Sequence, residues 1–215
     1  MKALWHMNSK NNQIISLAIT GASGVQYGFR LLEMLLQKDH TVYLMVSKAA
    51  QVVIGMETDV KLPSRCKEMQ QFLTEKYNCK TASDENPQLH VFGEDEWTAP
   101  TASGGGPVDA MVMCPCSMGA LSAVATGASN NLIERSADVM LKERRKLILV
   151  PRETPYSDIH LENMLKLSRM GAVMLCANPG FYNKAETIDD LIDFVVAKIL
   201  DQLNIEHDLQ PRWGE

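Results

Sequence analysis

Short apolar runs alternate with amphipathic segments along this chain, which is the pattern of an α/β protein. The apolar runs that fit buried strands cover residues 14–20, 41–46, 89–92, 110–114, 147–150 and 172–175. Segments with apolar residues at helical spacing lie at 24–36, 49–56, 66–77, 118–126, 132–144, 161–169 and from 188 onward. Because runs that are apolar throughout are buried on both faces of a sheet, we expect the sheet to be parallel.

Right-handed crossovers between such strands predict a single-domain, three-layer αβα sandwich with a doubly wound, Rossmann-like parallel sheet. The length of 215 residues and the hydrophobic fraction of 46% suit one domain with a substantial core. We expect this domain to cover residues 14–215. Residues 1–13 are polar, lack the apolar centre of a signal peptide, and are predicted to form a flexible N-terminal extension.

A few residues indicate where elements begin and end. Pro115 is expected to stop the strand at 110–114. Thr187, with Asp190 three residues later, fits a capping box at the start of the last helix. Ser23 and Ser117 each follow a strand and stand where an N-cap serine would lie.

Charge and cysteine usage exclude several classes of function. The formal net charge of −5 gives no electrostatic reason to expect nucleic acid or an anionic membrane as a partner. No apolar run approaches the length of about 20 residues that spans a bilayer. The five cysteines and five histidines show no metal-ligand spacing, so we expect no metal. Scattered, unpaired cysteines are typical of a reduced, cytoplasmic protein.

The chemically distinctive segments of the chain all directly follow predicted strands. They are Gly21-Ala22-Ser23, Ser47-Lys48, Pro115-Cys116-Ser117, Arg152-Glu153 and Pro179-Gly180-Phe181-Tyr182. Because the carboxyl ends of parallel strands meet at one edge of the sheet, these segments should lie together. Doubly wound folds bind their ligands at that edge.

The stretch from Gly21 to Gly28 predicts a phosphate site. A glycine-rich turn between a strand and a helix aims backbone N–H groups and the positive helix end at one spot. Ser23 stands in place of the second glycine of the dinucleotide fingerprint, and no acidic residue follows at the distance expected for a ribose. We therefore expect a mononucleotide and not NAD. The alternative is a structural corner without a ligand.

The other strand-end segments offer anion-binding and acid–base groups. The turn at Ser117 repeats the logic of the first turn, with a plain N-cap as the alternative. Arg152 and Glu153 lie on a short loop between two prolines, where arginine suits a phosphate and glutamate suits proton transfer. A structural ion pair is the alternative. Arg135 and Lys142 are seven residues apart on one helix face, which solvent alone would also explain.

Several long segments, taken in order, resemble the UbiX/Pad family of flavin prenyltransferases over residues 14–213. They include GASGVQYGFRLLE, CPCSMGALSAVATG, NNLIERSADVMLKERRKLILVPRETP, HLENMLKLSRMGAV and PGFYNKAETIDDLIDFVVAKILDQL. The resemblance implies a flavin-binding domain that joins a dimethylallyl group from dimethylallyl monophosphate to N5 and C6 of reduced FMN, without a metal. The prenylated FMN would serve UbiD-type decarboxylases, in ubiquinone biosynthesis or aromatic acid decarboxylation. The family forms homo-oligomers, commonly dodecamers.

The resemblance also assigns roles to individual residues. The FMN positions match Gly21, Ala22, Ser23, Ser47, Ser117, Met118, Gly119, Ala120 and Arg152. The dimethylallyl phosphate positions match Tyr182, Lys198, Lys142 and Arg135. The catalytic positions match Glu153, Ser23, Lys142 and Glu57. Relatives can carry arginine at the position of Lys198, which adds a bidentate fork that lysine lacks.

This assignment agrees with the chemistry expected from the residues. Fixed cations and N–H donors would stabilise a leaving phosphate, and the rings of Trp97 and Trp213 are candidates to stabilise an allylic cation. Two other functions stay open. A flavin-dependent decarboxylase would need a histidine where Gln26 and Tyr27 stand, and a non-catalytic FMN carrier would tolerate loss of Lys142, Glu153 and Lys198.

Overall fold

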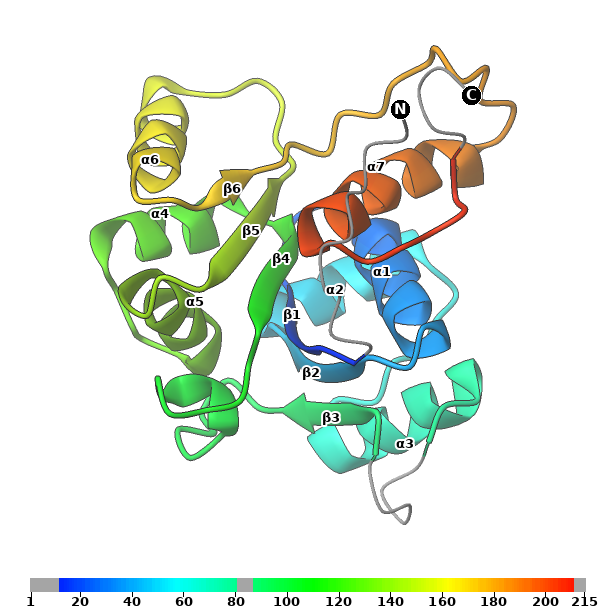
Figure 1. Cartoon of the computed structure of the whole chain (residues 1–215), viewed down its shortest axis with the longest axis horizontal. Helices are drawn as coiled ribbons and strands as arrows, with labels where there is room; N and C mark the ends of the chain where they lie inside the picture. The colour runs from blue at the N-terminus through cyan, green and yellow to red at the C-terminus, as the bar shows by residue number, and fades with distance from the viewer. Residues whose placement is uncertain (1–11, 81–86, 211–215) are drawn as a thin grey trace, which may run out of the picture.

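The computed structural model describes residues 12–80 and 87–210, whose six strands form one parallel sheet. The order across the sheet is β3-β2-β1-β4-β5-β6 (Figure 1). The strands are β1 (Ile14–Ile19), β2 (Thr41–Val46), β3 (Leu89–Phe92), β4 (Ala110–Cys116), β5 (Lys146–Pro151) and β6 (Val173–Met174). The predicted parallel, doubly wound sheet is confirmed.

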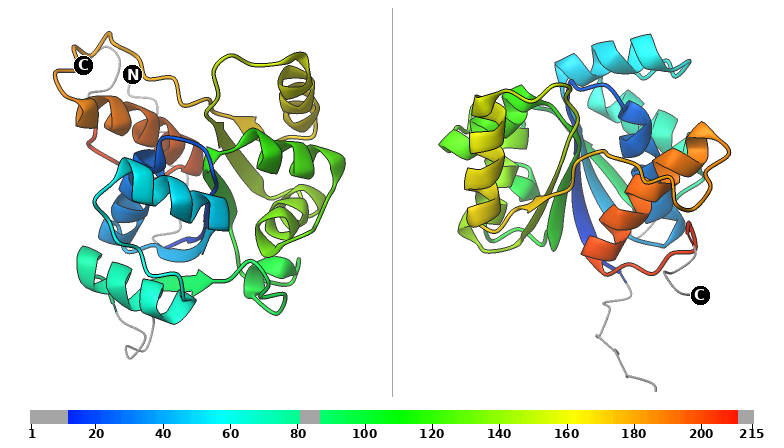
Figure 2. Two further views of the ribbon diagram at one scale, coloured as in Figure 1. Left: turned by 180° about the vertical axis from the view of Figure 1, so that it is seen from behind. Right: turned by 90° about the horizontal axis from the view of Figure 1, so that it is seen from above.

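Helices cover both faces of this sheet, which confirms the three-layer sandwich (Figure 2). One face packs against α1 (Val25–Gln37), α2 (Lys48–Glu57), α3 (Cys66–Tyr77) and α7 (Ile188–Leu203). The other face packs against α4 (Met118–Thr126), α5 (Leu132–Lys142) and α6 (Asp158–Arg169). A short 3₁₀ turn, η1 (Pro100–Ala102), lies beside α5.

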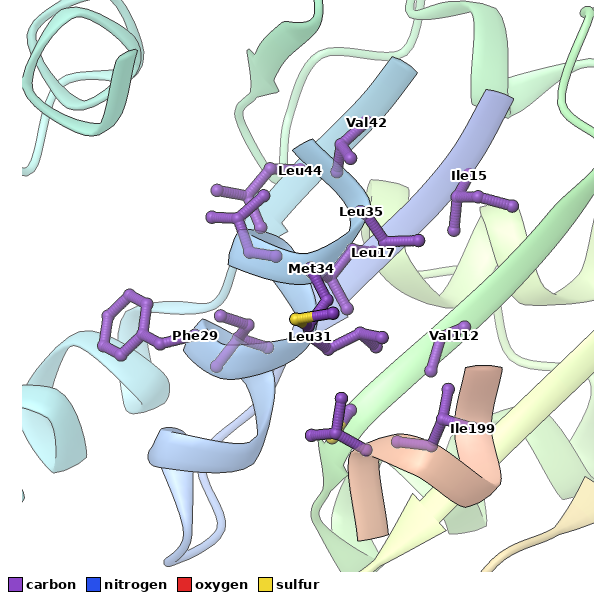
Figure 3. Packing of buried hydrophobic residues seen from close by; sticks show 14 of the residues in the cluster. Ile15, Leu17, Phe29, Leu31, Met34, Leu35, Val42, Leu44, Val112 and Ile199 are labelled. Carbon is purple, nitrogen blue, oxygen red and sulfur yellow. The ribbon is translucent and has the colours of Figure 1, made fainter. Parts of the chain in front are cut away.

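The alternation of apolar strands and amphipathic helices produces two buried layers. In the layer drawn in Figure 3, Leu17 of β1 lies close to Leu31 and Leu35 of α1, and all three are fully buried. Burying a side chain of this kind stabilises the fold by about 1.5–3 kcal/mol. The core therefore fixes α1 against the sheet, and with it the turn that joins β1 to α1.

The order of the strands places the candidate site. β1 pairs with β2 on one side and with β4 on the other, so successive connections leave β1 and β4 in opposite directions. Loops that diverge in this way open a crevice beyond the carboxyl ends of the two strands, where doubly wound folds bind ligands. The segments after β1 and β4 are the ones that carry Ser23 and Ser117.

The predicted end of the fourth strand was wrong. β4 continues through Pro115 to Cys116, because the pairing with β5 shifts register between Met113 and Cys116 and tolerates a residue without an N–H group. The carbonyl of Pro115 instead accepts hydrogen bonds from the N–H and the hydroxyl of Thr20, at 3.2 and 2.9 Å. The proline thus ties the end of β4 to the end of β1.

Other element ends agree more closely with the sequence. The capping box of Thr187 and Asp190 is present at the start of α7, and Ser117 caps α4. α6 starts three residues earlier than predicted, because Ser157 and His160 form a second capping box. Of the predicted extension over residues 1–13, residues 1–11 lie outside the described part, and Gln13 donates to His40 and to the carbonyl of Leu203.

Among the helices of residues 12–80 and 87–210, none combines the length and the apolar character needed to cross a membrane.

Candidate active site

Hydrogen bonds join the strand-end segments after β1, β2, β4 and β5 into one polar cluster. The N–H of Ser117 donates to the hydroxyl of Thr20 at 2.8 Å, and the guanidinium Nε of Arg152 donates to the carbonyl of Ser23 at 3.1 Å. The N–H of Ser47 donates to the carbonyl of Ile19 at 3.0 Å. The structure therefore brings together the segments in which the resemblance places the FMN positions.

The start of α1 differs from the prediction, because Gly24 and not Ser23 is its N-cap. Gly24 has φ of +96°, a backbone angle that residues other than glycine rarely adopt. Glycine has no side chain that could cap the helix. The carboxylate of Glu57 takes that role from the end of α2, accepting from the N–H groups of Gly24 and Val25 at 2.9 and 3.3 Å. Two N–H groups that were predicted to hold a phosphate thus hold a carboxylate.

The surroundings of Glu57 favour its ionised form. Partial burial raises the pKa of this carboxyl, but hydrogen bonds from the Ser23 hydroxyl and from the N–H groups of Gly24 and Val25 lower it further than burial raises it. The nearby guanidinium of Arg152 acts in the same direction, so the net shift of the pKa is downward. Ser23, Glu57 and Arg152 therefore form one electrostatic unit.

The three helix N-termini at this edge are not equivalent. α1 donates to Glu57, and the first N–H of α2 donates to the carboxylate of Glu94 at 3.1 Å. At the start of α4, the N–H of Ala120 donates to the hydroxyl of the N-cap residue Ser117. A Cβ added at Gly119 would meet no atom of the described residues within 4 Å. Of these three helices, α4 is thus the one whose start is not paired with a carboxylate in the described residues, which leaves it suited to an anion.

Gly21 has a different reason to be glycine from the one predicted. A Cβ at this position would lie 2.5 Å from the Cβ of Ala49 on α2, so the close approach is to a neighbouring helix. Gly21 therefore sets the packing of the first turn against α2, which carries Glu57 at its other end.

The loop after β5 presents Arg152, Glu153 and a tyrosine that the sequence analysis missed. Glu153 is half-buried and accepts from the N–H of Thr154 at 3.1 Å. Burial, a hydrogen bond to Cys176 and the nearby charge of Glu153 raise the pKa of Tyr156 to about 12. Tyr156 therefore stays protonated at neutral pH and can donate a hydrogen bond beside Glu153.

Lys198 lines a groove along β6, an outer strand of the sheet, and Tyr182 lies next to it. The groove has a volume of about 430 Å³, and its lining includes Cys176, Phe194, Lys198 and Asp201. The ring of Tyr182 packs edge-on against Phe194 with centroids 5.6 Å apart, and the ammonium of Lys198 lies 6.0 Å from the same ring. Lys198 is paired with Asp201 at 3.2 Å. The groove thus combines an aromatic wall with one cation.

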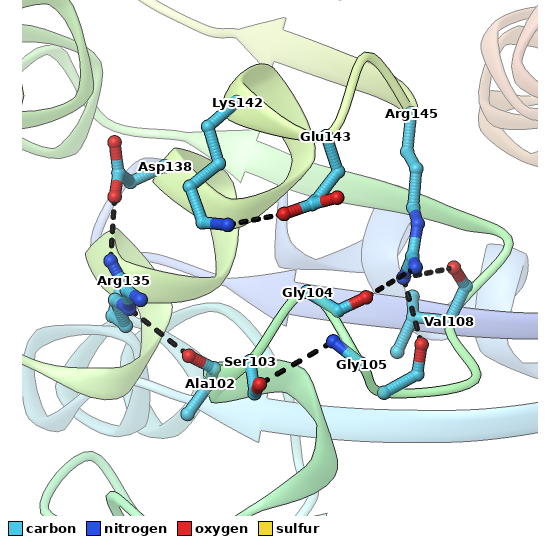
Figure 4. A network of polar contacts seen from close by, with 11 residues as sticks. Ala102, Ser103, Gly104, Gly105, Val108, Arg135, Asp138, Lys142, Glu143 and Arg145 are labelled. Carbon is cyan, nitrogen blue, oxygen red and sulfur yellow. Dashed lines mark hydrogen bonds and ion pairs between the residues drawn. The ribbon is translucent and has the colours of Figure 1, made fainter.

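Arg135 and Lys142 lie on α5, each with an acidic partner. Arg135 donates to the carbonyl of Ala102 at 3.0 Å and to Asp138 at 2.8 Å, and Lys142 pairs with Glu143 (Figure 4). Lys142 ends α5, four residues before β5 begins. The six residues of β5 span about 20 Å, so Lys142 and Arg152 lie at opposite ends of that strand.

The structure therefore divides the predicted site residues into three groups. The strand-end residues and Glu57 form one cluster, Lys198 lines the groove with Tyr182 packed against its Phe194, and Arg135 and Lys142 stand apart on α5. Trp97 is half exposed, and Trp213 lies outside the described residues. Glu94 and Glu143 were not predicted from the sequence either, since a lone glutamate in a polar segment gives no signal of its partner.

All five cysteines are free thiols, and burial raises the pKa of Cys114 and Cys116. Among the described residues, no group of three or more His, Cys, Asp or Glu side chains could hold a metal ion.

Comparison with known proteins identifies the family. The family model described as "Flavoprotein" matches residues 4–200. The flavin prenyltransferase UbiX of Pseudomonas aeruginosa is 60% identical over 201 residues, which cover 94% of each chain. The UbiX of Halalkalibacterium halodurans is 50% identical over 202 residues, again 94% of each chain.

Solved structures agree with this relationship. AnUbiX (PadA1), in complex with FMN and dimethylallyl pyrophosphate, is 38% identical with a TM-score of 0.82, covering 95% of this chain and 98% of that one. A dodecameric FMN-dependent UbiX-like decarboxylase from Escherichia coli O157:H7 is 38% identical with a TM-score of 0.80, covering 94% and 100%. The chain belongs to the flavoprotein family and, within it, to the UbiX flavin prenyltransferases.

Proposed function

We propose that this protein transfers the dimethylallyl group of dimethylallyl monophosphate to reduced FMN. The observation that carries the proposal is the cluster at the crevice between β1 and β4, where Ser23, Glu57 and Arg152 are linked by hydrogen bonds and charge. A doubly wound fold binds a nucleotide at this crevice. The relatives named UbiX supply the reaction, and the complex of AnUbiX with FMN and dimethylallyl pyrophosphate supplies the two ligand classes.

The residues at the crevice fit FMN. The N–H groups at the start of α4 and the guanidinium of Arg152 are donors for a phosphate, and Gly119 leaves open space beside them. At the start of α1, the carboxylate of Glu57 already accepts from the N–H groups and would repel a second anion, so we place no phosphate there. FMN supplies the nucleophilic ring that accepts the allyl group when bound, and the protein holds it between Ser23, Ser47 and Ser117.

The cations predicted for the allyl phosphate serve the leaving group. Lys142, Lys198 and Arg135 place positive charge where the phosphate gains negative charge, as a metal would elsewhere. Tyr182 and Phe194 form an aromatic wall beside Lys198 that excludes water from an allylic cation. Glu153 is the acid–base group that transfers protons at the reaction centre, and protonated Tyr156 is its neighbour.

These groups meet only in an oligomer. Lys142 lies one strand length from Arg152 in its own chain, so the Lys142 that serves a given flavin comes from another copy. α6 buries only Leu167, whereas Ile159, Leu161 and Leu165 of this helix and Met170 just after it are 42–66% exposed. Large apolar side chains left exposed in this way suit an interface. We propose a homo-oligomer, dodecameric like the Escherichia coli relative.

The product and its place follow from the same proposal. Prenylated FMN leaves this protein as the cofactor of a UbiD-type decarboxylase, in ubiquinone biosynthesis or aromatic acid decarboxylation. The five free thiols are typical of a reducing compartment, which supports a cytoplasmic enzyme.

One alternative has a specific observation in its favour, because two solved relatives are described as decarboxylases. The experiment that separates the two functions mixes the purified protein anaerobically with reduced FMN and dimethylallyl monophosphate or diphosphate. Mass spectrometry of the released flavin should show one added five-carbon unit. Unmodified flavin with both donors, together with CO₂ release from an aromatic acid, would favour the decarboxylase. Bound but unmodified flavin without CO₂ release would favour a carrier.

A further inference from the structure

Arg145, which lies outside the predicted site, holds a glycine-rich loop by three hydrogen bonds (Figure 4). Its guanidinium donates to the carbonyls of Gly104, Gly106 and Val108 at 2.6, 2.8 and 3.1 Å. A guanidinium can satisfy several carbonyls at once because its five donors form a rigid, planar fork. Arg145 therefore fixes the whole return of the chain toward β4.

The loop that Arg145 holds has little freedom of its own. A Cβ at Gly106 would overlap the carbonyl oxygen of Pro100, and the N–H of Gly106 donates to the carbonyl of Ser103 at 3.0 Å. Backbone turns back on itself between Pro100 and Gly106. The carbonyls of Gly104 and Gly106 in this loop, and of Val108 just after it, accept from Arg145.

Both cations of α5 rest on this loop. Arg135 donates to the carbonyl of Ala102 at 3.0 Å, and a Cβ at Gly104 would overlap the carboxylate of Glu143, which is the partner of Lys142. The hydrogen bond from Lys142 lowers the pKa of Glu143 and keeps it ionised. The loop thus contacts Arg135 directly and Lys142 through Glu143.

We propose that Arg145 is a positioning residue for the allyl phosphate, acting through the loop on Arg135 and Lys142. This inference rests on the proposed function, in which those two cations bind the donor. A cation presented to another copy must be in place before that copy binds substrate, since a misplacement of about 1 Å can cost about a hundredfold in rate. Arg145 holds the loop that Arg135 and Glu143 contact, and so positions the two cations without touching the substrate.

The test compares Arg145→Gln with Arg144→Gln in the full oligomer. Arg144 is the adjacent, exposed arginine, so its variant removes the same charge without a hydrogen bond to the loop. We expect Arg145→Gln to raise the KM for the allyl donor about tenfold or more, and to leave the KM for reduced FMN and the oligomer size within about twofold of the parent. Arg144→Gln should leave both KM values within about twofold.

A purely structural role would change both KM values in parallel or release FMN, and either result would overturn the inference. So would a donor KM within about twofold of the parent in a well-folded Arg145→Gln oligomer. If that variant does not assemble, Arg145→Lys decides. A donor KM raised about threefold or more supports the inference, and an unchanged donor KM refutes it.

A second readout separates this inference from the proposed function. The affinity for inorganic pyrophosphate, measured by calorimetry, reports the cations without any transfer reaction. If the parent protein binds pyrophosphate but makes no prenylated flavin, the proposed function fails. Weaker pyrophosphate binding by Arg145→Gln would in that case still support the positioning role of Arg145. If the parent makes prenylated flavin, but the parent and Arg145→Gln bind pyrophosphate with equal affinity, the positioning role of Arg145 is refuted and the proposed function stands.

Discussion

The carboxyl edge of the sheet and α5 carry polar groups of similar chemistry but opposite construction. At the carboxyl edge, groups from different strands bond to one another, as Arg152 does to Ser23 and Glu57 to Gly24. On α5, Arg135 near the start and Lys142 at the end pair with exposed or half-exposed carboxylates. The first region holds the fold together, and the second is presented outward.

This difference separates stability from function. Hydrogen bonds between buried or half-buried groups are costly to break, at about 1–3 kcal/mol for an unsatisfied partner. Exposed ion pairs contribute about 0–1 kcal/mol. Substitutions at the carboxyl edge should therefore affect folding as well as catalysis, whereas substitutions on α5 should affect donor binding with little change in folding.

The largest effect is expected for Glu153→Gln. Loss of an acid–base group typically lowers turnover by about a hundredfold to ten-thousandfold. FMN affinity should stay within about twofold, because the amide keeps the shape of the carboxyl group and its acceptor oxygen. Anaerobic turnover and FMN titration measure the two quantities. Turnover equal to that of the parent would remove Glu153 from the reaction.

Lys142→Met should lower kcat/KM for the allyl donor by about a hundredfold, since one fixed positive charge next to the leaving phosphate is lost. The melting temperature should change by less than about 2 °C, because the lost pair with Glu143 is exposed. Steady-state kinetics and thermal denaturation test both statements. A large loss of stability without a kinetic defect would mean that Lys142 stabilises the fold and does not bind the donor.

Glu57→Gln should destabilise the protein by about 1 kcal/mol at pH 7, because an ionised carboxylate no longer caps α1. The folded-state pKa of Glu57 lies below its ordinary value of 4.5. Its contribution is therefore complete above pH 4.5 and is lost as the pH falls through the lowered pKa. Urea denaturation of both proteins at several pH values should show a difference that shrinks in acid. A constant difference would contradict the assigned cause.

The smallest effect is expected at the groove, for Lys198→Arg. A guanidinium grips a phosphate with two donors where lysine offers a single point of charge, so the donor KM should fall about threefold. Lys198→Met is the matched control and should raise it. Steady-state kinetics with the allyl donor measures both. A donor KM unaffected by either substitution would place the phosphate away from this groove.

The sequence predicted the fold well because its signals are local. Apolar runs and capping residues such as Thr187 and Ser117 act within a few residues, so periodicity located each strand and α-helix. The end of β4 failed because tolerance of Pro115 depends on a register shift relative to β5, which is a property of two strands. The same holds for Gly24, whose helix is capped by Glu57 from another element.

The site was predicted in part for the same reason. The strand-end rule located Ser23, Ser117 and Arg152 together. It gave no sign that Glu57 occupies the start of α1, or that Arg145 clamps the loop beneath Lys142, because both contacts join distant segments. The sharing of one site between two copies that we propose likewise gives no local signal in the sequence of one chain.

Mixing two inactive variants, Glu153→Gln and Lys142→Met, in one oligomer tests directly whether each active site is built from two copies of the chain. If each site takes Lys142 and Glu153 from different copies, random co-assembly should restore roughly a quarter of the parent activity. Each variant assembled alone should stay inactive. If both residues act from the same chain, every site in the mixture carries a defect. A mixed oligomer that stays inactive would therefore contradict a site shared between two copies.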